Sequence, residues 1–205
     1  MTMTLTILGC GSSGGVPRIG GDWGLCDPTN PRNRRRRCSI LLEKAGASGV
    51  TRVLIDTSPD LREQMLSAGV GEIDGVCFSH EHADHTHGID ELRGFFLRQW
   101  RRVPIWADEP TMAMLKRRFA YCFETTAGSD YPPVVVAYTL EAGREVAISG
   151  AGGTITLAPF TVQHGHIEAL GFRIGNTAYT PDLNAVPEAS PPYLSDLDLW
   201  IVDAL

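Results

Sequence analysis

The sequence predicts one domain of mixed α/β (α+β) class, built from short strands joined by many turns. Its 205 residues suit a single domain, and 43% of them are apolar, which is enough for a buried core. Twenty-two glycines and thirteen prolines favour frequent turns over the long helices of a bundle. We therefore expect one domain over residues 1–205, in which strand-length apolar runs alternate with segments of helical spacing.

The first elements follow from alternation and from turn residues. Residues 4–8 alternate polar and apolar side chains and predict a strand, and the runs at 39–43 and 52–56 predict a strand pair. Residues 61–68 have helical spacing, and Gly69 ends that helix.

The middle of the chain alternates strands and helices. Residues 76–78 and 104–107 are short apolar runs that predict buried strands. Residues 88–97 and 110–123 have the apolar spacing of helices, with Met112 among the side chains of the expected core.

The last third predicts strands alone. Strands are expected at residues 134–138, 144–148, 154–162, 171–174, 177–179 and 197–205. The dipeptide at 175–176, Gly-Asn, predicts the turn of a hairpin.

Residues 79–85, Ser-His-Glu-His-Ala-Asp-His, carry the densest set of metal-binding side chains. They lie between an expected strand and an expected helix, so His80, His82, Asp84 and His85 can point to both sides of one turn. Three imidazoles and a carboxylate suit zinc, with manganese or iron as competitors. The alternative, a solvated turn, is disfavoured because all six histidines fall into two clusters, at 80–87 and 164–166.

Three other features have two interpretations each. Asp56 ends a strand and either orients a ligating histidine or caps the next helix. The glycine-rich segment 9–15 is either a plain tight turn or a source of backbone N–H groups for an anion. The arginines of residues 32–37 form either a solvated strand entry or an anion-binding rim of the active site.

Composition limits the ligands and the cellular compartment that we expect for the protein. A net charge of −6 disfavours broad binding of long nucleic acid. Five cysteines, an odd number without a CxxC pair, indicate a reducing compartment and therefore the cytoplasm. The first eight residues lack the basic start of a signal peptide, and no run of 18 apolar residues indicates a membrane span.

The pattern His-x-His-x-Asp-His at 80–85 resembles the signature of the metallo-β-lactamase superfamily. The resemblance implies a four-layer αββα sandwich with a dinuclear metal site at one edge of the sheets. It implies that metal one is held by His80, His82 and His164, metal two by Asp84 and His85, and that Asp182 bridges both. His166 competes with His164, which directly follows its strand and precedes a glycine as in the family.

Three further segments, at 8–17, 33–39 and 170–174, are similar to one branch of the superfamily. That branch contains the phosphoribosyl cyclic phosphate phosphodiesterases and lies near the tRNA 3′-processing endonucleases. Its members often carry Cys-x-Cys-x-x-Cys as a structural zinc site, whereas this chain has Gly21, Trp23 and Cys26 there. One thiolate cannot close a tetrahedral site, so we expect no structural zinc.

The resemblance implies a hydrolase with two divalent ions, Zn or Mn, and most simply a phosphodiesterase that uses a metal-bridging hydroxide. Asp84 would orient the hydroxide, and a small cyclic phosphodiester or nucleotide-like molecule would be the substrate. Candidate substrate-binding residues are Arg34, Arg35, Arg37, Ser12 and Ser13. The alternatives are thioester, lactone or β-lactam hydrolysis, RNA processing, and a binding module without catalysis.

Members of the superfamily complete metal two with a further histidine and draw a candidate general acid from the same later region. No histidine follows His166 here, so we expect the chain to lack its natural C-terminal part. The alternative is that Asp203 or water fills that position. The sequence leaves monomer and homodimer open.

Overall fold

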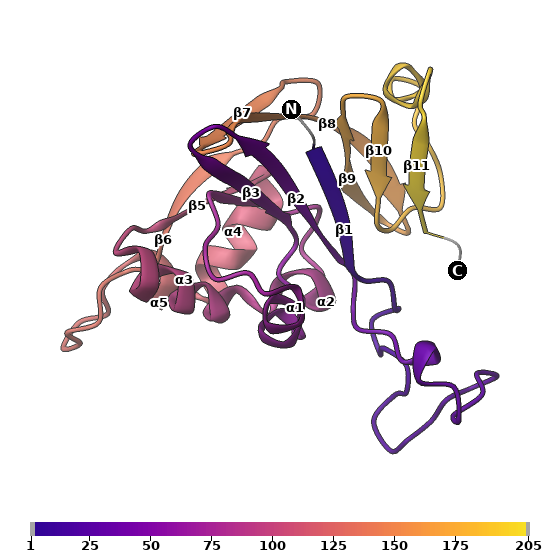
Figure 1. Cartoon of the computed structure of the whole chain (residues 1–205), viewed down its shortest axis with the longest axis horizontal. Helices are drawn as coiled ribbons and strands as arrows, with labels where there is room; N and C mark the ends of the chain where they lie inside the picture. The colour runs from indigo at the N-terminus through magenta and orange to yellow at the C-terminus, as the bar shows by residue number, and fades with distance from the viewer. Residues whose placement is uncertain (1–2, 204–205) are drawn as a thin grey trace.

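The computed structural model describes residues 3–203, which form two sheets and a layer of helices (Figure 1). The first sheet contains, in spatial order, β1 (Met3–Gly9), β2 (Ser39–Gly46), β3 (Gly49–Ile55), β4 (Gly75–Cys77), β5 (Val103–Ala107) and β6 (Val135–Thr139). The second contains β11 (Leu199–Val202), β10 (Thr177–Thr180), β9 (Ile167–Ile174), β8 (Gly153–His164) and β7 (Val146–Gly150). The predicted mixed α/β class with short strands is confirmed.

Strand direction in the first sheet decides where the loops meet. Strands β1 to β3 are antiparallel neighbours, whereas β3 to β6 are parallel. Parallel neighbours need crossovers, and these contain the helices α1 (Leu61–Ala68), α3 (Leu92–Gln99) and α4 (Glu109–Arg118). Because Ile55 pairs with Cys77 at the ends of β3 and β4, the segments that follow these two strands start side by side.

Alternation along the strands gives the first sheet two apolar faces. One face packs against the helices, with Leu41, Leu54, Val76 and Ile105 in one buried cluster with helix residues such as Leu61 and Leu115. The other face packs against the second sheet, with Ile40, Leu42, Val53 and Ile55 in a cluster that also contains Phe172 and Ile174. The first sheet is therefore a central layer between the helices and the second sheet.

Some predicted elements differ from those in the structure. The helix expected at 110–123 divides into α4 and α5 (Ala120–Phe123), because Phe119 leaves the helical region with φ −126° and ψ 39°. The helix expected at 88–97 begins as the 3-10 turn η2 (Ile89–Glu91), and the strand expected at 144–148 is β7, displaced by two residues. The metal-binding turn contains an unpredicted short helix, α2 (Ala83–Thr86), whose four residues are too few for a periodic signal.

Of the four expected layers, residues 3–203 form the helical layer and both sheets. The outer face of the second sheet carries Phe160, whose ring stacks on that of Tyr193 at 5.3 Å in η3 (Pro191–Leu194). The last two residues of the strand expected at 197–205 lie outside the described residues. Within the described range, no helix is long and apolar enough to cross a membrane.

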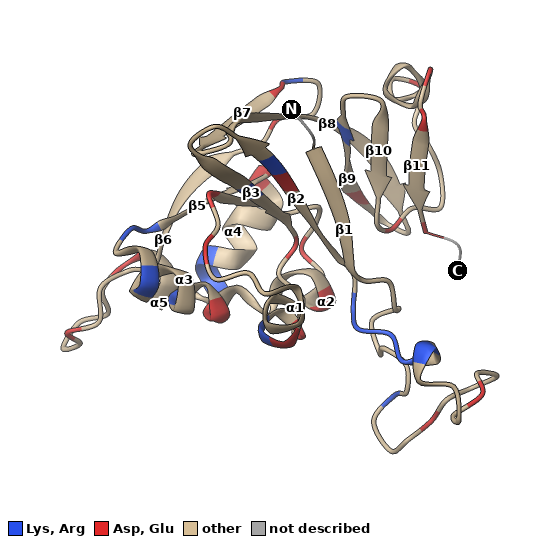
Figure 2. Cartoon of the chain, viewed as in Figure 1, with Lys and Arg blue, Asp and Glu red and all other residues tan. Residues whose placement is uncertain are grey.

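A long loop leaves the sheets between β1 and β2 and projects from the body of the protein (Figure 1). It contains the 3-10 turn η1 (Pro31–Asn33), and its returning strand-like part is basic (Figure 2). At its base, Val16 and Arg35 exchange two backbone hydrogen bonds of 2.9 Å, and the N–H of Gly11 donates to the carbonyl of Arg36 at 2.8 Å. Backbone bonds therefore hold the base of this loop.

Candidate metal centre

The metal-binding turn follows directly from the end of β4. Its geometry is fixed by the carbonyl of His82, which accepts hydrogen bonds from the N–H of His85 at 3.1 Å and from Oγ1 of Thr86 at 2.8 Å. His80 and His85 are buried, whereas His82 is exposed. The turn therefore directs two imidazoles inward and presents a third at the surface.

One group of potential ligands joins this turn to the second sheet. It contains His80, His82, His164 and Asp182, whose ligating atoms all lie within 4.8 Å of one another. Nε2 of His164 is 3.2 Å from Nδ1 of His82, and Oδ2 of Asp182 is 3.5 Å from Nε2 of His80. His164 ends β8 and Asp182 follows β10 by two residues, so packing of the sheets assembles the group.

A second group contains Asp84, His85 and Asp182, again with ligating atoms within 4.8 Å of one another. Nε2 of His85 lies 2.9 Å from Oδ2 of Asp182 and 3.5 Å from Oδ2 of Asp84. Asp182 belongs to both groups, so the structure offers two neighbouring cation positions that share one carboxylate. Among the described residues, no other histidine, cysteine or carboxylate joins either group.

The donor atoms themselves fit metal ions. Nε2 of His80 and Nε2 of His85 are buried and make no hydrogen bond within the described chain. Buried polar atoms without partners are rare and need an explanation. Neutral imidazole nitrogen and carboxylate oxygen are good ligands for zinc, so a pair of divalent ions would satisfy both nitrogens.

Asp56 orients the inward-pointing histidines. Its carboxylate accepts hydrogen bonds from the backbone N–H and the hydroxyl of Ser79, both at 2.7 Å, and lies 2.8 Å from Nδ1 of His85. The Ser79 hydroxyl lies in turn 2.9 Å from Nδ1 of His80. Both rings are thereby held with Nε2 toward the ligand groups, an arrangement that raises ligand basicity and fixes the tautomer.

The structure thus selects between the two interpretations of Asp56. Within residues 3–203, Asp56 orients a ligating histidine and does not cap a helix. It is fully buried at the end of β3, with a φ of 65° that is uncommon for a residue with a side chain. Strain of this kind persists where surrounding contacts fix it, often at functional sites. Ser79, which sequence analysis gave no role, links Asp56 to His80.

Electrostatics distinguish the two buried histidines. Burial, reinforced by the charge of His85, lowers the pKa of His80 to about 2. Burial also disfavours the charged form of His85, but the neighbouring carboxylates of Asp56, Asp182 and Asp84 outweigh it and raise the pKa of His85 well above 6.5. Of the two buried imidazoles, His85 is therefore the one that favours the protonated form.

Asp84 stays ionised in the metal-free site. Burial opposes its charge, yet the neighbouring imidazole of His85 lowers the pKa of Asp84 to about 2. Asp84 also lines a cavity of about 640 Å³ that opens beside the ligand groups. Its carboxylate is therefore placed to accept a proton or a hydrogen bond from a molecule in that cavity.

The other residues considered in the sequence, His166, His87 and Ser12, lie outside the two ligand groups. His166 is exposed in the turn before β9, and His87 is exposed with its ring against Phe119, centroids 5.3 Å apart. Ser12 lines a cavity of about 240 Å³ together with Asp182 and Asp203. Neither His166 nor His87 belongs to a ligand group.

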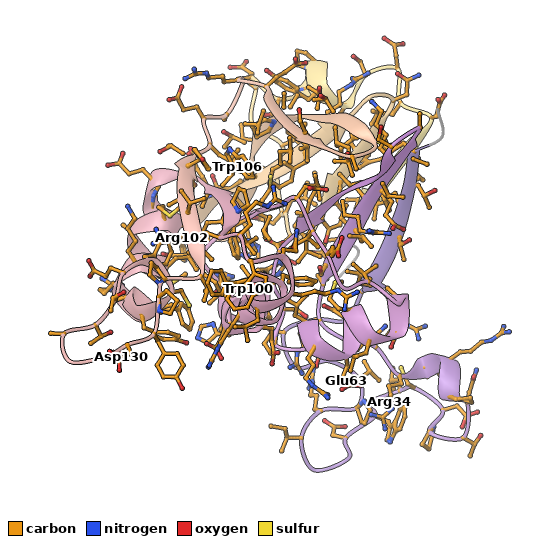
Figure 3. All side chains as sticks on the ribbon, turned by 60° about the vertical axis from the view of Figure 1, so that its left-hand side comes forward. Arg34, Glu63, Trp100, Arg102, Trp106 and Asp130 are labelled. Atoms are coloured by element: carbon orange, nitrogen blue, oxygen red, sulfur yellow. The ribbon has the colours of Figure 1, made fainter. Side chains whose placement is uncertain are left out.

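The arginine run divides into residues near the site and residues away from it. Arg37 and Ser13 line the cavity that Asp84 also lines. Arg34 lies on the projecting loop (Figure 3), its guanidinium 6.0 Å from the Trp23 ring centroid, and Arg35 donates from Nη1 to the carbonyl of Arg34 at 3.3 Å. Sequence analysis missed Arg18, which joins Arg37 at this cavity, because it lies in a loop without periodic signal.

A family model described as the β-lactamase superfamily domain matches residues 51–205, three quarters of the chain. The chain belongs to this superfamily. The expected fold is confirmed by a solved superfamily structure, a diphosphatase of the PhnP family, which shares 35% identity and a TM-score of 0.82. That alignment covers 97% of this chain and 73% of the diphosphatase.

Two curated relatives of the chain carry different names. The first is an octanoyltransferase of Porphyromonas gingivalis, 29% identical over 204 residues, 99% of this chain and 39% of that protein. The second is a ribonuclease Z of Bradyrhizobium diazoefficiens, 30% identical over 146 residues, 69% of this chain and 45% of that protein. The chain spans less than half the length of either protein.

Proposed function

We propose that this protein is a hydrolase that depends on two divalent metal ions and cleaves phosphodiester or diphosphate bonds of small molecules. The observation that carries the proposal is the sharing of Asp182 by two ligand groups, beside two buried imidazole nitrogens that have no hydrogen-bond partner among residues 3–203. When bound, two such ions supply positive charge for the phosphate oxygens and a water molecule of lowered pKa. Zinc and manganese are the candidates.

The residues of the site would hold the two ions, orient a ligand and orient the attacking water. His80, His82 and His164 would hold one ion, Asp84 and His85 the other, and Asp182 both. Asp56 would keep His85 oriented through its 2.8 Å contact with Nδ1. Asp84, ionised and on the cavity wall, would orient the attacking water by accepting a hydrogen bond from it.

The choice of phosphate esters has two supports. The PhnP-family diphosphatase and the ribonuclease Z are both named for the cleavage of phosphate bonds. In addition, two arginines line the cavity beside Asp84, and guanidinium groups pair well with phosphate oxygens. A thioester or lactone would leave these charges without a role. A short, nucleotide-like substrate and a location in the cytoplasm are parts of the same proposal.

A substrate panel tests the proposal directly. The purified protein, loaded with zinc or with manganese, is offered bis(p-nitrophenyl) phosphate, a nucleoside diphosphate ester, a chromogenic thioester, a lactone and a β-lactam. We expect turnover of the phosphate compounds and little of the others. Thioester turnover at least ten-fold faster than phosphodiester turnover would reject the phosphodiesterase assignment, and no turnover of any compound would favour a binding module.

A further inference from the structure

We propose that Cys10 and Cys38 are a redox-active thiol pair, which glutathione disulfide or a similar small disulfide converts into an intramolecular disulfide bond beside the metal centre. This modification site is separate from the groups that the proposed function uses. Three features support it: the cross-strand position of the two cysteines, the cavity that both line, and a buried hydroxyl in that cavity without a hydrogen-bond partner among residues 3–203.

The register of β1 and β2 places the two cysteines opposite each other. Gly9 pairs with Ser39, and Gly11 forms a bridge with Arg37, so the cysteines occupy the facing positions between these two pairs. Directly opposite Cα atoms in an antiparallel pair are about 4.5–5.5 Å apart, and a disulfide bond needs about 4.4–6.8 Å. The backbone spacing therefore suits a disulfide bond at this place.

The two side chains share one cavity. Sγ of Cys38 lies 3.4 Å from the carbonyl oxygen of Gly11, the residue that directly follows Cys10. Both cysteines line a cavity of about 240 Å³, which Asp182 lines as well. Both thiols are free in this structure. A bond between them would therefore form inside a cavity that contains the carboxylate shared by the two ligand groups.

Accessibility decides the order of the reaction. Cys10 is exposed, so its thiolate attacks one sulfur of glutathione disulfide, and the first glutathione leaves as a thiolate that takes up the proton from Cys10. Burial raises the pKa of Cys38 to about 12, so this thiol keeps its proton until a sulfur is held beside it. Cys38 then attacks Sγ of Cys10, and its proton passes to the second departing glutathione. Two thiols are oxidised and one glutathione disulfide is reduced.

The cavity also contains a hydroxyl group that can assist the second step. The hydroxyl of Tyr179 is buried and has no hydrogen-bond partner among residues 3–203. Tyr179 lines the same cavity as both cysteines, and burial raises its pKa well above 10, so the hydroxyl stays protonated. A protonated hydroxyl can donate a hydrogen bond to the sulfur of Cys38 as that sulfur loses its proton. This gives a reason for a buried polar group without a partner.

The disulfide bond would act on two regions at once. It would close residues 10–38 into one covalent loop, which contains the whole projecting loop between β1 and β2. It would also change the lining of the cavity beside Asp182. The oxidation state of the pair is thereby linked in space to the metal centre.

Peptide mapping tests the pair directly, because trypsin separates the relevant cysteines. Cys10, Cys26 and Cys38 fall in the tryptic peptides 1–18, 19–32 and 38–44. The protein is incubated with glutathione disulfide, alkylated and digested without reductant, and the peptides are identified by mass spectrometry. We expect peptide 1–18 to be linked to peptide 38–44, and we expect dithiothreitol to remove the link.

Cys26 provides the comparison within the same molecule. It is exposed and should keep glutathione as a stable mixed disulfide. Cys10 should carry at least about ten-fold less glutathione than Cys26, because a thiol held beside it acts at an effective concentration on the order of millimolar or higher. In Cys38→Ser, glutathione should remain on Cys10 at a level within about two-fold of that on Cys26.

Two further variants complete the test. Cys26→Ser is the matched control and should form the link as the wild type does, whereas Cys10→Ser should leave Cys38 unmodified. Stable glutathione on Cys10 of the wild type, no reaction at Cys10, or a link found only in covalent dimers on a non-reducing gel overturns the proposal. Cys10→Ser and Cys26→Ser alter exposed side chains, so these arms stand even if Cys38→Ser destabilises the fold. Turnover plays no part in these measurements, so failure of the proposed function leaves their outcome unchanged.

Discussion

The metal-binding turn and the projecting loop meet at one cavity but are held in place differently. The turn, residues 79–85, places His80 and His85 in the interior and fixes both rings through Asp56 and Ser79. The loop between β1 and β2 is attached through backbone hydrogen bonds at its base, and its basic side chains are partly exposed. We therefore expect substitutions in the turn to cost more metal affinity and stability than substitutions of the exposed side chains of the loop.

Removal of a metal ligand should have the largest effect on metal content and on the phosphodiesterase rate. In His82→Ala, we expect loss of the ion held with His80 and His164 and a fall in phosphodiesterase rate on the order of 10³-fold, since an ion contributes several kcal/mol to catalysis. His82 is exposed, so the variant should remain folded. Elemental analysis, circular dichroism and rates on bis(p-nitrophenyl) phosphate check this. Full metal content in the variant, or wild-type protein without metal after expression with zinc and manganese, would contradict it.

Loss of the orienting carboxylate should have the next largest effect. Asp56→Asn keeps the size of the side chain but replaces an acceptor that faces Ser79 and His85. We expect metal affinity to fall by about 10–100-fold. Chelator competition measures the affinity, with Asp130→Asn, an exposed loop position, as the control. Identical affinities in both variants would mean that Asp56 has only a structural role.

The pH dependence of metal binding should distinguish the two ligand groups. The pKa of His85 is raised well above 6.5 by Asp56 and the neighbouring carboxylates, although burial opposes this. A metal must displace that proton, so affinity at Asp84 and His85 should fall as pH falls from 8 to 6, by up to about ten-fold per pH unit. His80, with a pKa lowered to about 2, binds no competing proton in this range. Zinc titrations at three pH values test this, and equal slopes for both binding steps would refute it.

The smallest effect is expected on the projecting loop. Arg34 is exposed, lies over the Trp23 ring and does not line the cavity of about 640 Å³ beside Asp84. Arg34→Gln should therefore change kcat/KM for bis(p-nitrophenyl) phosphate by less than about two-fold, as is usual for exposed charges. A loss of about ten-fold or more would show that the projecting loop contacts the substrate.

Much of the fold was predictable because it depends on local pattern. Alternation and turn residues located strands such as β2, β3 and β8 to within a few residues. The break at Phe119 and the short helix α2 were not predictable, because packing of Phe119 against His87 and hydrogen bonds to the His82 carbonyl arise only in the folded chain. The position of Arg18 beside Arg37 was hidden for the same reason.

The sequence by itself determined the ligand types and their order, because the spacing of 80–85 after a buried strand allows one turn to present four metal-binding side chains. It also determined the superfamily, since that spacing is a family signature. The family resemblance implied that Asp182 is shared by both metals, and the tertiary structure brings it within reach of both ligand groups. The tertiary structure alone decided between the two interpretations of Asp56, which orients His85. It also decided which arginines face the cavity. The physical reason is distance along the chain: Asp182 follows Asp56 by more than a hundred residues, and only the packing of one sheet on the other brings them to the same histidine.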